Sequence, residues 1–366
     1  MNVSYTSLLT VVMTTSILTI LLSIVISFIG RTMYIDPRYI LLPAILLVIK
    51  CFLPCEFFYT ITLASKKILP SFQRIMQVNM PFINISIFKL AVIIWVLGIF
   101  LKLIILTYKE YKMALEISKF PVSEYTDILT RITKEKGISK KISLLEIPGI
   151  ASPALVGIRN AKIIIPNNLA QKDLYYILLH EVEHFKSKDM YFIMFLQLVC
   201  IIYWWNPIFY ILKINVQRLI ELRVDRMITI DMAEEKKLDY LQSLINVAKL
   251  QKQKNIKFSL GWGFYEKQSE LSRRLYNVLN SDNIRYGYFL SGGLVILILL
   301  SSAVVVEPYS IKSEYAQGTF DIPENSYIIE KDGLYEVYLN GKYYFTLDNI
   351  NRLESLPQYI SKEIKK

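Results

Sequence analysis

The sequence has few cysteines, few histidines and few charged residues for its length. Of its 366 residues, 3 are cysteine, 2 are histidine and 20% are charged, whereas an average soluble domain carries about 25% charged residues. Three cysteines exclude a disulfide-rich scaffold. The shortage of charge and the 53% of hydrophobic residues exclude a disordered chain and a single soluble globule. The composition therefore indicates an integral membrane protein.

The chain carries an excess of positive charge. It has 42 Lys and Arg against 31 Asp and Glu, a formal net charge of +11. Such an excess can serve nucleic-acid binding, but in membrane proteins Lys and Arg gather on the cytoplasmic side of the bilayer. We therefore expect contact with membrane lipid and no direct binding of nucleic acid.

Four apolar stretches are long enough to cross a bilayer, which takes about 20 residues. They lie at about 8–29, 39–60, 85–106 and 286–306. The distribution of Lys and Arg places the N-terminus and the tail outside the cell and residues 108–285 in the cytoplasm. We predict a mainly α-helical, multi-pass protein of a bacterial cell membrane. Three spans lie in 1–107, an α+β domain in 108–285, a fourth span in 286–306 and a small extracellular α/β module in 307–366.

Both histidines of the chain lie in one pentad, His180-Glu181-Val182-Glu183-His184. Apolar spacing predicts a helix over residues 174–186, so the two imidazoles share one helix face and can hold one metal ion. Glu181 can act as the general base that takes a proton from the attacking water. The alternative, an ordinary exposed helix face, leaves unexplained why a chain so poor in histidine pairs them here. The H-E-x-x-H pattern predicts a metallopeptidase.

Two histidines make an incomplete zinc site, because catalytic zinc takes three protein ligands. With no third histidine, the remaining ligand must be a carboxylate or a thiolate, and Glu221 is the best candidate. Asp225 follows it by one helical turn and can orient a ligating imidazole, as can Asp189. The alternative is a solvated helix face on which Glu221 pairs with neighbouring bases such as Arg218.

Residues 190–212 contain no charged residue. Hydropathy alone would predict another span here, which would place Glu221 across the membrane from the histidines. The pair Asn206-Pro207 resolves the conflict, because proline interrupts a helix. We predict two apolar segments, near 190–204 and 208–220. They form a re-entrant or interfacial hairpin that holds the site close to the membrane surface.

A β-branched run at 162–165 lies between glycine and proline residues. This pattern is typical of an edge strand, and an extended peptide can bind to such an edge by strand addition. Gly157, Ile163 and Ile165 are therefore candidates for substrate binding. A purely structural hairpin explains the same residues equally well.

The pentad with Asp189, the Trp205-Asn206-Pro207 turn, the Glu221-x-x-x-Asp225 pair and the strand region together resemble a known family. It comprises the integral-membrane, gluzincin-like zinc metallopeptidases of the BlaR/MecR antirepressor type. The resemblance implies that Zn²⁺ is held by His180, His184 and Glu221, with Glu181 as general base. It also implies that an external signal is relayed by self-cleavage, expected within 255–285, by proteolysis of a cytoplasmic DNA-binding repressor, or by both. A homodimer is compatible with this prediction.

The segment after residue 306 differs from a penicillin-sensing domain. It contains neither Ser-x-x-Lys nor Lys-Thr-Gly, so we do not expect covalent β-lactam sensing by a serine in this segment. Asn340-Gly341 between two strand-like runs predicts a hairpin with a type I′ turn. Residues 351–366 are expected to form a helix.

Two other functions remain open on the sequence. One is a housekeeping membrane metallopeptidase similar to the CAAX-processing and heat-shock enzymes, which share H-E-x-x-H and a later Glu-x-x-x-Asp. A helix-turn-helix repressor encoded beside the gene would favour signalling over this function. The other is a non-catalytic sensor with a structural metal site, which bound zinc without Glu181-dependent proteolysis would favour.

Overall fold

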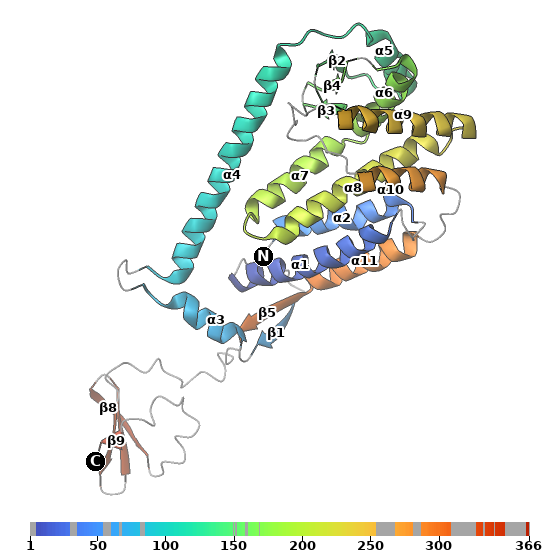
Figure 1. Ribbon diagram of the computed structural model, residues 1–366. Helices are drawn as coiled ribbons and strands as arrows, with labels where there is room; N and C mark the ends of the chain where they lie inside the picture. The colour runs from blue at the N-terminus through green and yellow to red at the C-terminus, as the bar shows by residue number, and fades with distance from the viewer. Residues whose placement is uncertain are drawn as a thin grey trace. The chain divides into compact units, whose positions relative to one another are not determined.

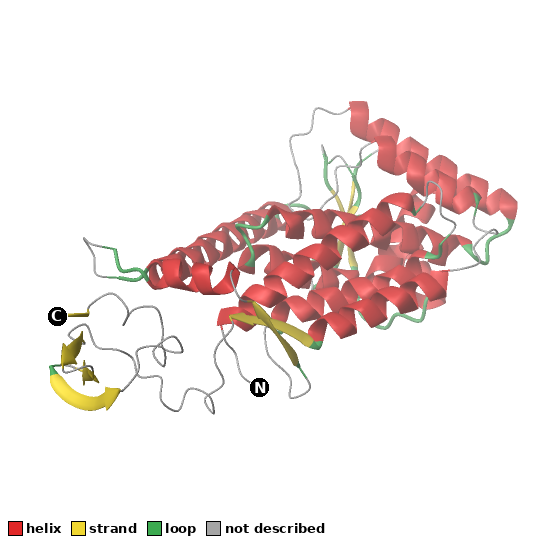
Figure 2. Cartoon of the chain, turned by 90° about the horizontal axis from the view of Figure 1, so that it is seen from below, coloured by secondary structure: helices red, strands yellow, loops and turns green. Residues whose placement is uncertain are grey.

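The computed structural model describes residues 5–29, 35–53, 60–65, 68–80, 85–148, 150, 152–157, 160–167, 169–253, 268–280, 287–308, 327–331, 334–339, 341–347 and 364–365. Its contacts divide the chain into two units, Met1–Pro308 and Tyr309–Lys366. Helices dominate the first unit and strands the second (Figure 2).

A bundle of apolar helices forms the base of the first unit. Helices α1 (Tyr5–Phe28), α2 (Pro37–Phe52) and α11 (Gly287–Ser302) lie side by side, and α8 (Pro207–Thr229) packs on α1 and α2 (Figure 1). Leu22, Ile26 and Leu47 are among the buried side chains that hold this bundle together. The predicted zinc-binding segment is therefore packed directly on the N-terminal helices, within one unit.

Among the described residues, two helices are long and apolar enough to cross a membrane, Leu9–Phe28 and Ile87–Ser118. The second is α4, which continues well past the predicted end of the third span at 106. Helices α2 and α11 have 16 residues each. They are therefore about 24 Å long, less than the roughly 30 Å of hydrocarbon. A four-span topology remains a prediction.

Two of the predicted spans end earlier than expected. Helix α2 ends at Phe52, and Ile61–Ser65 forms strand β1, so a helix through residue 60 was wrong. Helix α11 ends at Ser302 and leads into β5 (Val304–Pro308), which pairs in parallel with β1. Hydropathy gave no sign of this pairing, because its two strands are more than 200 residues apart in the sequence. Helix α3 (Ile68–Gln77) follows β1 and leads towards α4.

The apolar segment 190–220 folds back on itself, as its proline predicted. Helix α7 (Asp189–Ile202) ends before a turn, and α8 begins at Pro207. Asn206 caps α8, since its side-chain oxygen accepts a hydrogen bond from the amide of Ile208 at 3.0 Å. Tyr203 anchors the turn by donating a hydrogen bond to the Cys51 carbonyl at 2.8 Å. The predicted break is confirmed, while its position relative to a membrane stays a prediction.

A three-stranded sheet stands beside the histidine helix. It consists of β2 (Ser143–Glu146), β3 (Ala154–Val156) and β4 (Lys162–Ile165) in the order β2-β4-β3. Strand β4 is parallel to β2 and antiparallel to β3, so it is central. The prediction of an edge strand at 162–165 was therefore wrong. Ile163 and Ile165 are fully buried, as expected of an apolar run with neighbours on both sides.

Gly157 lies in the turn between β3 and β4 and has a structural role. Its φ of +81° is a left-handed conformation that favours glycine. A Cβ atom there would lie 2.5 Å from the Asn160 carbonyl oxygen. The turn thus requires glycine, and a part for Gly157 in substrate binding stays a prediction.

Four further helices complete the surroundings of the histidines. They are α5 (Thr126–Glu135), α6 (Gln171–Lys186), α9 (Glu234–Gln253) and α10 (Gln268–Leu279). Helix α6 packs against α5, α7, α8, α9 and β3. The histidine helix is therefore held on several sides, which limits its movement.

The second unit is a small sheet of β6 (Tyr327–Lys331), β7 (Leu334–Leu339), β8 (Lys342–Leu347) and β9 (Ile364–Lys365), in the order β8-β7-β6-β9. The antiparallel β7–β8 pair confirms the predicted hairpin, with Gly341 at a φ of +75°. Most of the predicted helix at 351–366 lies outside the described residues. At Ile364–Lys365 that prediction was wrong, since these residues form a strand parallel to β6.

Candidate metal centre

Helix α6 presents the two histidines, as the sequence predicted. It begins at Gln171, and Asp173 in its first turn suits the positive end of the helix dipole. Leu174 and Leu178 are buried in the core, and this burial fixes the rotation of the helix about its axis. As a result, His180 and His184 face helix α8.

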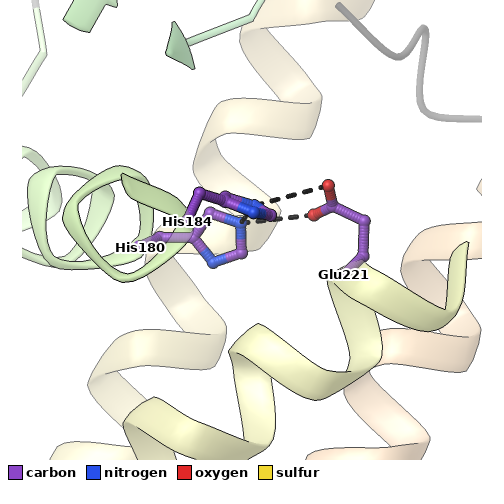
Figure 3. A group of neighbouring side chains, drawn as sticks. All are labelled: His180, His184 and Glu221. Carbon is purple, nitrogen blue, oxygen red and sulfur yellow. Dashed lines mark hydrogen bonds and ion pairs between the residues drawn. The ribbon is translucent and has the colours of Figure 1, made fainter. Parts of the chain in front are cut away.

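Glu221 of α8 meets the two imidazoles. His180 Nε2 lies 3.1 Å from His184 Nε2 and 3.2 Å from Glu221 Oε2. His184 Nε2 lies 3.5 Å from Glu221 Oε1. Figure 3 shows the three side chains pointing toward one another from two helices. Ligand atoms about 2.0–2.1 Å from a tetrahedral ion are about 3.3 Å apart, so the cluster has the spacing of a metal site.

Asp189 orients the His184 ring, the role predicted for it. Its Oδ2 atom accepts a hydrogen bond from His184 Nδ1 at 2.8 Å and another from Arg223 Nη2 at 2.5 Å. Because Nδ1 carries the proton in this arrangement, the Nε2 lone pair is directed at the cluster. Such a partner commonly sets the tautomer and direction of a metal-binding histidine.

Asp225 supports His180 through an intermediate that the sequence did not indicate. Tyr240 lies between them, with its hydroxyl 3.0 Å from His180 Nδ1 and donating to Asp225 Oδ1 at 2.5 Å. The Asp225 carboxylate is 3.4 Å from the ring nitrogen. It also accepts two hydrogen bonds from Arg274, both at 2.7 Å. Hydrogen bonds from Tyr240 of α9 and Arg274 of α10 thus hold Asp225, and Tyr240 and Asp225 together position the His180 ring.

The charges of the cluster suit a cation. Two imidazole Nε2 atoms and one carboxylate converge at hydrogen-bond distance, and which ring nitrogen donates depends on the tautomer. Burial alone would lower the pKa of His184, but the carboxylates of Glu221 and Asp189 raise this pKa to about 10. Burial would raise the pKa of Glu221, but the two imidazoles hold it well below its usual range. The cluster therefore attracts positive charge, either a proton or a metal cation, and its donor atoms fit a divalent metal.

The cluster opens into a cavity of about 170 Å³. The cavity is lined by Ser152, Pro153, Ala154, Leu155, Tyr176, Ile177, His180, Glu181, His184, Asp189, Met190, Ile193, Arg218, Glu221, Leu222, Ser243, Leu244, Val247, Glu270, Arg273 and Arg274. Glu181 is thus in the same cavity as the metal-binding candidates, and burial raises the pKa of its carboxyl group. Strand β3 forms one wall of the cavity through Ala154 and Leu155. The sequence had predicted this role for the strand at 162–165, which is β4.

Two residues that support the site were missed on the sequence, Tyr240 and Arg274, while Arg223 was a candidate to stabilise the oxyanion and instead binds Asp189. Tyr240 is an ordinary apolar position of an amphipathic helix, and nothing local marks it. Arg223 and Arg274 had an indirect signal, because buried carboxylates such as Asp225 need a cationic partner. Residues 255–285 were considered for self-cleavage; 254–267 and 281–286 lie outside the described residues, and 268–279 form α10.

An H-E-x-x-H helix joined by a carboxylate from a later helix is the ligand arrangement of metallopeptidases that use two histidines and one glutamate. The comparison with protein families agrees. The chain belongs to the BlaR1 peptidase M56 family, whose sequence model matches residues 9–278.

The curated relatives are similar at low identity. The regulatory protein BlaR1 of Bacillus licheniformis is 23% identical over 221 residues, which cover 59% of this chain and 37% of that protein. The methicillin resistance mecR1 proteins of Staphylococcus aureus and Staphylococcus epidermidis are 25% identical over 174 residues, 46% of this chain and 30% of theirs. The match thus spans about a third of the length of these relatives.

Proposed function

We propose that the chain is a membrane zinc endopeptidase that relays an external signal by cutting itself, a cytoplasmic repressor, or both. One observation carries the proposal: the His180–His184–Glu221 cluster, Glu181 and an edge strand of a sheet line one cavity. Family membership supports the peptidase class. The alternative of a structural metal site does not account for a carboxylate and a sheet edge in the same cavity.

In this proposal, two imidazoles and one carboxylate hold zinc, which suits this donor set. Bound zinc supplies a Lewis acid that polarises the peptide carbonyl. Glu181 removes a proton from the attacking water, whose oxygen forms the new bond to the carbonyl carbon. The C–N bond then breaks, and Glu181 returns the proton to the leaving amine nitrogen.

Strand β3 is the element that would bind the substrate backbone. It is an edge of the sheet, and its residues Ala154 and Leu155 line the cavity. The opposite edge, β2, is already covered, because Val122 bridges to Leu145 and the Ser123 amide donates to the Leu144 carbonyl at 2.9 Å. An extended peptide added to β3 would place its backbone beside Glu181.

The signalling part of the proposal rests on the relatives, which are named as a regulatory protein and as resistance proteins. We extend this role to the present chain with a DNA-binding repressor as substrate, cut on the cytoplasmic side. The two candidate spanning helices, α1 and α4, are consistent with a membrane location. An external signal would enter through parts of the chain on the opposite side.

The test uses the full chain, produced in membranes with the repressor candidate encoded nearest to its gene. Glu181→Gln should abolish fragments of the chain and of the repressor while zinc content stays at one ion per chain. Glu183→Gln is the matched control, because Glu183 lies in the same pentad but faces Lys136 at 3.0 Å. Cleavage by Glu181→Gln at the wild-type rate would refute the proposed chemistry. Glu181-dependent cleavage of other membrane proteins, with both the chain and the repressor left intact, would favour a housekeeping peptidase.

A further inference from the structure

Peptide hydrolysis places negative charge on the carbonyl oxygen, and an N–H or O–H donor usually stabilises this oxyanion. Both histidines of the chain are already used in the metal cluster. We propose that the guanidinium of Arg218 is the catalytic group that stabilises the oxyanion. This inference rests on the proposed peptidase function and names a further residue of its site.

Arg218 is placed on the correct face of α8. It precedes Glu221 by three residues, so the two side chains lie on the same side of the helix. Both line the cavity that holds Glu181. The side chain of Arg218 is 26% exposed, and this exposed surface is available to a molecule in the cavity.

Arg218 also has unused donors. Its Nη1 donates to Asn215 at 3.1 Å. Its Nε lies 3.0 Å from Glu270 Oε1, yet makes no hydrogen bond there. Its Nη2 has no hydrogen bond to any residue in the described part of the chain. The guanidinium can therefore donate to a carbonyl oxygen without giving up a bond it already makes.

The other cations of the cavity are less suitable. Arg274 directs Nε and Nη2 at Asp225, both at 2.7 Å, and is needed to hold that carboxylate. Arg273 is 5% exposed, so it presents little surface to the cavity. Arg223 binds Asp189 and Ser187 and is not among the described residues that line the cavity.

Tyrosine hydroxyls near the cavity are the other donors to compare with Arg218. Tyr240 is fully buried, and its hydroxyl is bound between His180 and Asp225. Tyr176 lines the cavity, and its ring centroid lies 6.0 Å from that of Tyr240. Among the described cations of the cavity, Arg218 combines exposed surface with unused donors, and Tyr176 is the rival that a Tyr176→Phe variant tests.

The experiment measures cleavage of internally quenched peptides by the full, zinc-loaded chain in detergent micelles. The peptides carry apolar residues on both sides of the central bond, because much of the cavity wall is apolar. Arg218→Gln should lower kcat by about 10²- to 10³-fold, change KM only a few-fold and leave bound zinc unchanged. Arg218→Lys should recover part of kcat, since an ammonium can still donate one hydrogen bond. Arg131→Gln, at an arginine that is 76% exposed on α5, is the matched control.

Two further measurements separate catalysis from structure. Glu270→Gln removes the ion pair but keeps the guanidinium, so it should lose much less kcat than Arg218→Gln. A phosphinic peptide, whose tetrahedral anion resembles the charged transition state, should bind Arg218→Gln much more weakly than wild type. The affinity of the substrate peptide, measured in the Glu181→Gln background, should change little.

The outcomes are distinguishable. If Glu181→Gln abolishes cleavage but Arg218→Gln cuts at the wild-type kcat, the peptidase function stands and the inference about Arg218 is wrong. The same holds if Tyr176→Phe loses kcat in its place, or if Arg218→Gln changes KM alone. If Glu181→Gln cuts normally, the proposed function itself fails.

Discussion

Replacing Tyr240 by phenylalanine tests whether the buried hydrogen-bond chain supports metal binding. The hydroxyl is the closest partner of His180 Nδ1, at 3.0 Å, and it donates to Asp225 at 2.5 Å. Phenylalanine keeps the ring that fills this fully buried position. The substitution thus removes two hydrogen bonds and little packing.

The size of the effect follows from these contacts. A hydrogen bond to a charged group contributes about 1.5–3 kcal/mol, and about 1.4 kcal/mol corresponds to a tenfold change in affinity. In Tyr240→Phe, the His180 ring can turn toward Asp225, which is already 3.4 Å away. We therefore expect zinc to bind about 10- to 100-fold more weakly, the usual cost of losing a partner that orients a ligand.

The assay is competition for zinc between the purified chain and a chromophoric chelator in detergent. Tyr191→Phe, at an exposed tyrosine of α7, removes a hydroxyl away from the cluster and should bind zinc like the wild type. Far-UV circular dichroism of both variants checks that the helices are intact. A zinc affinity for Tyr240→Phe within twofold of the wild type would refute the view that this hydroxyl holds His180 in its ligating position.

Two further predictions concern stability, each measured by thermal unfolding in detergent. Lys188, between α6 and α7, has a left-handed φ of 59°, which strains a residue other than glycine. Lys188→Gly should therefore stabilise the chain by about 0.5 kcal/mol, whereas Lys249→Gly inside α9 should destabilise it by about 1 kcal/mol. Equal shifts in unfolding temperature would show that the backbone at Lys188 is not strained. Asp36 is 2% exposed and accepts a hydrogen bond from Arg226 at 2.9 Å. Asp36→Asn should therefore cost about 3 kcal/mol. The exposed control Asp127→Asn should cost little, and similar losses for both would show that the buried Asp36 carboxylate, which also pairs with Arg38, does not stabilise the fold.

Local sequence signals located the core of the site. The apolar spacing before His180 predicted helix α6, and the spacing of the two histidines predicted that they share one face of it. Pro207 predicted the reversal that brings Glu221 back to the histidines, because a proline interrupts a helix whatever its surroundings. These features were predictable because each depends on a few neighbouring residues.

The features that were missed or wrong depend on pairing over long distances. Whether Ile163 lies in a central or an edge strand is decided by which strands bind β4, and the pattern of one strand does not contain this information. Likewise, β1 exists because it pairs with β5 across most of the chain. Tyr240 and Arg274 reach the site from helices whose own sequences carry no metal-binding signal.

The contact between Arg274 and Asp225 joins two stretches of chain on opposite sides of residues 254–267. A backbone cut within those residues would leave His180, His184 and Glu221 on one fragment and Arg274, with the last apolar helix, on the other. Breaking the peptide bond would not by itself take the centre apart, since the two fragments would still be joined by this ion pair. The lifetime of the assembled centre in a nicked protein would then depend on how long α10 stays docked.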